Sequence, residues 1–157
     1  MHAVQVEVVL LSVTPDDQLR WRAVAGELGA ASRPDARARQ LAGLDDDVAP
    51  GTVVHSTSWR AVANGLILTY AVLPDPRPAA GTVRPVPADA RIICSADAAA
   101  PCPPVVAVEH VLAHALRHLS LLARTDPALV AAIDTHPRLW DAVVARAPDV
   151  AGELVFA

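Results

Sequence analysis

The sequence predicts an α+β protein in which a mixed, mostly antiparallel sheet with a central Asn-Gly hairpin is sandwiched by helices. Three observations support this class. Residues 4–13 form an apolar run typical of a covered strand, two β-rich runs flank Asn64-Gly65, and residues 105–123 repeat apolar side chains with helical spacing. Because the hairpin lies between helical stretches, this order fits a layered α+β fold better than a doubly wound parallel sheet.

Composition limits the classes of function. The 157 residues suffice for one domain, 1–157, and its core must rest on Val, Leu, Ile and Ala because aromatic residues make only 3%. The net charge of -4, without clustered arginines, argues against a nucleic-acid partner. The apolar start lacks a basic n-region and is too short to span a bilayer, so we expect a cytoplasmic protein with no membrane partner.

The first third of the chain predicts one strand and two helices. Residues 4–13 are expected to be a central strand. Thr14-Pro15-Asp16-Asp17 combines an N-cap candidate with proline and two carboxylates, which predicts a helix from there to about Leu28. The segment beginning Ser32-Arg33-Pro34 repeats these signals and predicts a shorter helix that ends before Gly43.

The hairpin supplies the first candidate site. With Asn64 and Gly65 as a two-residue turn, counting outward places Trp59 opposite Tyr70. One face of the hairpin then gathers His55, Thr57, Trp59 and Tyr70. Stacking rings beside hydrogen-bonding groups are the mixture expected of a small-molecule pocket, although an ordinary aromatic pair over the core is the alternative.

The second half predicts a proline-rich connection followed by helices. Prolines between residues 74 and 90 indicate an extended segment with a short edge strand at 82–86, and residues 91–95 read as a further strand. The long helix at 105–123 is followed by helices that start at Pro127 and Pro137.

The long helix supplies the second candidate site. His110, His114 and His118 follow one another at intervals of four residues, on the flank of the apolar stripe. Histidines four apart can share zinc, but HExxH is absent, because Glu109 precedes His110, and the cysteines lack CxxC spacing. We therefore predict no metal site, and a polar flank that faces solvent, a groove or another subunit, with ligand binding as the functional alternative.

Other chemical signatures are weak. Asp45-Asp46-Asp47 could recruit Mg²⁺, although a solvated loop explains them more simply. The serines lack a GxSxG elbow, and no glycine-rich phosphate loop occurs, so we predict neither a catalytic residue nor a cofactor. Cys94 and Cys102 are expected to be free thiols.

Three segments carry a family resemblance. HSTSWR at 55–60, NGLILTYAVLPDP at 64–76 and VEHVLAHALRHLSLLARTDP at 108–127 resemble uncharacterised actinobacterial proteins with Nudix-like folds. The resemblance implies α-β-α layering. The Nudix box is not present, since residues 26–47 lack the carboxylates that hold Mg²⁺ in that family, so the resemblance transfers no catalytic residue.

These observations favour a non-catalytic protein that binds a small molecule or another protein. The alternatives are a divergent metal-dependent hydrolase of a nucleotide or small phosphate ester, and a structural subunit of an oligomer such as a homodimer. The expected ligand-binding residues are His55, Thr57, Trp59, Tyr70, His110, His114 and His118.

Overall fold

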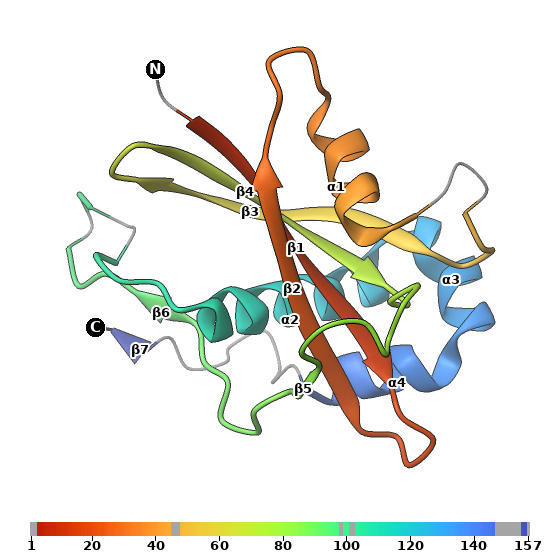
Figure 1. The fold of residues 1–157 in the computed structure, drawn as a ribbon. Helices are drawn as coiled ribbons and strands as arrows, with labels where there is room; N and C mark the ends of the chain where they lie inside the picture. Colours follow the sequence, from red (N-terminus) through yellow and green to blue (C-terminus); the bar gives the residue numbers. More distant parts are fainter. Residues whose placement is uncertain (1–2, 45–47, 98, 101–102, 147–154, 157) are drawn as a thin grey trace.

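A five-stranded sheet forms the centre of the molecule (Figure 1). The computed structural model describes residues 3–44, 48–97, 99–100, 103–146 and 155–156. The strands of the sheet, in spatial order, are β3 (Val53–Val62), β4 (Gly65–Leu73), β1 (Ala3–Val13), β2 (Leu19–Glu27) and β5 (Arg84–Pro85). The central pair β1 and β4 is parallel and the other pairs are antiparallel, so the predicted mixed, mostly antiparallel sheet flanked by helices is confirmed.

Helices cover both faces of the sheet and divide the core into two clusters. The helical segments are α1 (Pro34–Ala42), α2 (Val108–Thr125), the 3-10 turn η1 (Pro127–Leu129), α3 (Val130–Thr135) and α4 (Pro137–Arg146). Alternate residues of β1 point to opposite faces, as a pleated strand requires. Val9 and Leu11 belong to the cluster under α2 and α4, whereas Val8 and Leu10 pack with α1.

The predicted helix from Asp16 to Leu28 is wrong, because this segment is strand β2, joined to β1 by a tight turn. The Thr14 Oγ1 accepts a hydrogen bond from the amide of Gln18 at 3.0 Å, and Asp17 adopts a left-handed φ of 60°. Thr and Asp accept hydrogen bonds from nearby backbone N–H groups, and Pro fixes φ, both at helix starts and in turns. From Leu19 to Arg22 apolar and basic residues alternate, which is the strand pattern that decides the outcome.

The predicted Asn64-Gly65 turn is also displaced. The turn residues are Ala63 and Asn64, and Val62 pairs with Gly65. Neither Asn64 nor Gly65 has the positive φ that a type I′ turn would require. Gly65 instead starts β4 against β1, where a Cβ atom would lie 1.8 Å from the carbonyl oxygen of Ala3. Because residue 65 has no Cβ atom, β4 and β1 can approach each other closely at this point.

Several other elements agree with the sequence predictions. The helices starting at Pro34 and Pro137 occur as expected, the long helix is α2, and β5 falls within the predicted edge strand. Strand β6 (Ile93–Cys94) pairs in parallel with β7 (Val155–Phe156) in a separate two-stranded sheet. The expectations for Asp45-Asp46-Asp47 and for Cys102 lie outside the described residues, as does the side chain of Cys94.

Within the part of the chain that the structure describes, no helix has the length and hydrophobicity needed to cross a membrane.

Candidate functional site

A cavity lies between the end of β3, the first half of α2 and the segment that carries β6. Its volume is about 520 Å³, which falls in the range of small-molecule sites. Most of the described lining is apolar, and its polar side chains come from β3 and α2. The lining includes Trp59, Arg60, Ile93, Val106, His110 and His114. The cavity thus combines apolar walls with a few polar side chains.

The charge of Arg60 is compensated within the protein. Its guanidinium donates to both carboxylate oxygens of Glu7, at 2.9 and 3.1 Å, and also to the Thr69 hydroxyl at 3.3 Å. Such a two-pronged pair holds the guanidinium in one orientation. Glu7 lies on β1 and Thr69 on β4, so this network crosses three strands beneath one wall of the cavity. Arg60 consequently brings no unbalanced charge to a ligand.

His110 presents a defined hydrogen-bonding edge. Its Nδ1 accepts the backbone N–H of Ala107 at 3.2 Å, which closes the first turn of α2. A neutral ring whose Nδ1 is an acceptor carries its proton on Nε2. His110 therefore adds an N–H donor to the largely apolar lining.

His114 is a polar group of the cavity lining that has an unpaired nitrogen among the described residues. Its ring lines the cavity, and its Nδ1 is buried without a hydrogen-bond partner among the described residues. Burial lowers the pKa of His114 below its ordinary value of 6.5, and the charges of His118 and Arg117 lower it further. The ring is thus held neutral, with one nitrogen that a bound molecule could satisfy.

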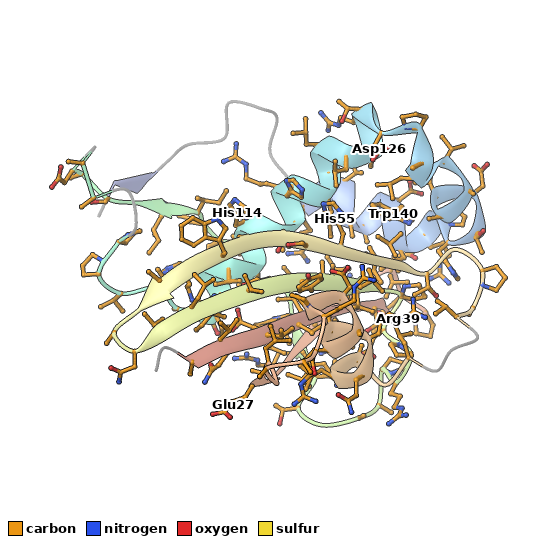
Figure 2. The ribbon with its side chains drawn as sticks, turned by 90° about the horizontal axis from the view of Figure 1, so that it is seen from above. Glu27, Arg39, His55, His114, Asp126 and Trp140 are labelled. Carbon is orange, nitrogen blue, oxygen red and sulfur yellow. The ribbon has the colours of Figure 1, made fainter. Side chains whose placement is uncertain are left out.

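The histidine stack, comprising His55, His118 and His114, extends from β3 along α2 to the cavity. The Nε2 atoms of His55 and His118 lie 2.9 Å apart, and their ring planes differ by only 15°. The His118 and His114 rings are also nearly parallel, with centroids 6.4 Å apart. Figure 2 shows His55 and His114 on the same side of the sheet as Trp140, with Arg39 of α1 on the other.

The predicted cluster of His55, Thr57, Trp59 and Tyr70 does not form on one face. A β-bulge between Ser56 and Ser58 shifts the pairing, so His55 lies opposite Ala71 and Trp59 opposite Leu68. The predicted pairing of Trp59 with Tyr70 is therefore wrong. Its cause is the displaced turn together with the bulge, neither of which has a sequence signal as strong as Asn-Gly.

The four residues of the predicted cluster lie in different surroundings. Tyr70 donates a hydrogen bond to Asp35 of α1 at 2.7 Å, and buried Thr57 donates to the carbonyl of Thr69 at 3.3 Å. Trp59 lies at the cavity margin with 66% of its surface exposed. His55 joins the histidine stack. The structure thus brings Trp59, His110 and His114 to one cavity, with His55 and His118 behind it.

Sequence reasoning did not find the Arg60 and Glu7 pair or the wall formed by Ile92 and Ile93. Glu7 is a carboxylate within a strand that the sequence predicts to be covered, and a covered carboxylate needs a partner. Its position was a usable signal for a buried ion pair. The sequence has no corresponding signal for the packing of residues 92–93 beside α2.

Among the described residues, no three His, Cys, Asp or Glu side chains are arranged to hold one metal ion. The histidine stack fits this finding, since the His55 and His118 nitrogens face each other directly.

Comparison with protein-family models, curated proteins and solved structures finds no match to this chain. The Nudix-like resemblance therefore stays a prediction.

Proposed function

We propose that this protein binds a small, uncharged and largely apolar molecule in the cavity between β3 and α2. The observation that carries the proposal is a cavity of about 520 Å³ with an apolar lining and two histidines one helical turn apart. Apolar walls with a few fixed polar groups are the usual composition of small-molecule sites.

The balance of charge supports an uncharged ligand. Arg60 is neutralised by Glu7, and burial holds His114 neutral. Transfer of an unpaired ion into such surroundings would cost several kcal/mol. The ligand would carry a hydrogen-bond acceptor for His110, because the Nε2 of a neutral His110 ring is a donor.

A direct test is a fluorescence titration with N-phenyl-1-naphthylamine, an uncharged apolar probe that brightens on leaving water. We expect saturable binding of one probe per chain. Val106→Trp should weaken binding by about tenfold or more, since an added ring takes up space along the cavity wall.

Val105→Trp is the matched control for this test. Val105 is 76% exposed, so the same added ring at the next position should leave the affinity unchanged. The proposal fails if the folded wild-type protein does not bind the probe, or if both variants bind it as the wild type does.

A further inference from the structure

The contact between His55 and His118 is a hydrogen bond with a single proton between the two Nε2 atoms. With the two Nε2 atoms 2.9 Å apart, one must donate N–H and the other must accept with its lone pair. Ring centroids only 5.0 Å apart, in nearly parallel planes, fit rings that meet edge to edge. The contact joins β3 to α2, and uptake of one proton by the pair leaves it intact.

A second proton breaks this contact. When both rings are cations, each Nε2 is a donor and neither can accept, so two N–H groups face each other and repel. The link between edge strand β3 and α2 is then lost. Because His114 stacks on His118 and also lines the cavity, this change occurs directly behind the cavity wall.

The surrounding charges favour the neutral state at neutral pH. Burial is the main cause that lowers the pKa of His55, the charge of His118 adds to it, and Asp126 after α2 opposes it. On α2 itself, Arg117 disfavours a charged His114. The carboxylate of Glu7 on β1 is already paired with Arg60 of β3, so it is not free to stabilise a protonated ring.

We infer that ligand binding in this cavity is coupled to the protonation of the histidine stack, so that the ligand binds the neutral stack and is released when the stack becomes charged. The inference rests on the proposed function. An apolar molecule placed against the His114 ring removes water that would solvate its cation, and it therefore lowers the pKa of His114 further. By linkage, protonation must weaken ligand binding by the same factor.

The test is the pH dependence of N-phenyl-1-naphthylamine affinity from about pH 7.5 to about pH 5.5, the range in which histidine titrates. The probe stays uncharged across this range. In the wild type we expect the affinity to decrease as the pH is lowered. The full decrease is about tenfold for each unit by which the bound probe lowers the pKa of His114. His114→Gln removes the titrating ring from the wall and should flatten this dependence.

Two further variants sharpen the result. His118→Gln removes one imidazole from the stack together with its ring contact to His55, so it should reduce the slope. His136→Gln is the control, because His136 contacts the Pro50 carbonyl and belongs to neither the stack nor the cavity lining. It should keep the wild-type slope. Melting temperatures at each pH verify that every variant is folded.

The possible failures are distinguishable. If the wild-type affinity does not change with pH, or if His114→Gln keeps the wild-type slope, the coupling is disproved while the cavity remains a binding site. If the folded wild type fails to bind the probe even at about pH 7.5, the proposed function fails and the coupling fails with it.

Discussion

The two faces of the sheet differ in how completely their buried polar groups are paired, although each face holds an ion pair, Arg22 with Asp75 on the α1 face and Arg60 with Glu7 on the α2 face. On the α1 face, the polar side chains of Tyr70 and Arg22 form hydrogen bonds with carboxylates. Tyr70 donates to Asp35, and Arg22 makes two hydrogen bonds with Asp75, at 2.6 and 2.8 Å. On the α2 face, a cavity remains open beside a histidine whose Nδ1 has no partner among the described residues.

This difference separates stability from function. Paired groups on the α1 face fix one arrangement, because losing either partner leaves a buried polar group without compensation. The unpaired Nδ1 of His114 on the α2 face lowers the stability of the empty protein, and a ligand that completed its hydrogen bonding would gain affinity. Substitutions on the two faces should therefore have different signatures.

The largest effect should come from breaking the Arg22 and Asp75 pair. Both side chains are buried, at 8% and 1% exposure, so Asp75→Asn should lower the free energy of unfolding by about 3–5 kcal/mol. Urea denaturation measures the loss. The double variant Arg22→Met with Asp75→Leu should recover much of it, because an apolar pair leaves no buried charge. A single variant as stable as the wild type would mean that the α1 face is not held by this pair.

A matched pair of enlargements compares the packing of the two faces. Val8 is fully buried in the α1 cluster, so Val8→Phe should cost about 1–3 kcal/mol of unfolding free energy. Val106→Phe adds the same atoms beside the cavity and should change stability by less than about 1 kcal/mol. Thermal denaturation of both variants makes the comparison. Equal losses would show that the cavity region is as tightly packed as the α1 face.

The smallest effect concerns Tyr70, the only tyrosine of the chain. Burial, together with the Asp35 hydrogen bond and charge, raises the pKa of Tyr70 from 10.0 to about 12. The unfolded chain ionises near 10.0, so the contribution of this phenol is present below that pH and is lost as pH rises toward 12. Phenolate absorbance should therefore show a midpoint near 12 in the folded protein.

Asp35→Asn should move that midpoint toward 10.0, because it removes the carboxylate beside the phenol. Tyr70→Phe should cost about 1 kcal/mol of stability, a modest value because Asp35 is exposed. A midpoint of 10.0 in the wild-type protein would contradict the hydrogen bond between Tyr70 and Asp35.

The sequence predicted those helices and strands whose formation depends on residues close together in the chain. Proline starts and apolar stripes located α1, α2 and α4, and apolar runs located β1 and the β3–β4 hairpin. The signal failed at residues 14–18, where one set of residues serves equally as a helix start and as a turn. Only the pairing of β2 with β1 resolves that choice.

The candidate site depends on contacts that no local pattern encodes. His55 and His118 are 63 residues apart in the chain, and Arg60 and Glu7 are 53 residues apart. The sequence identified the three histidines of α2 and the polar residues of β3 as candidates. It could not determine which meet, because one shifted turn and one bulge decide which side of β3 each residue occupies.

The bulge in β3 makes the length of this strand as important as its composition. Alternation alone would put His55 on the side of the sheet opposite to Arg60, yet the extra residue brings both to the α2 face. The alternation of β3 side chains between the two faces of the sheet therefore shifts by one residue near Thr57. A protein with one residue fewer between His55 and Arg60 would keep the same side-chain types but turn its histidine away from α2. In evolution, a single-residue deletion here would remove the histidine contact more surely than most substitutions.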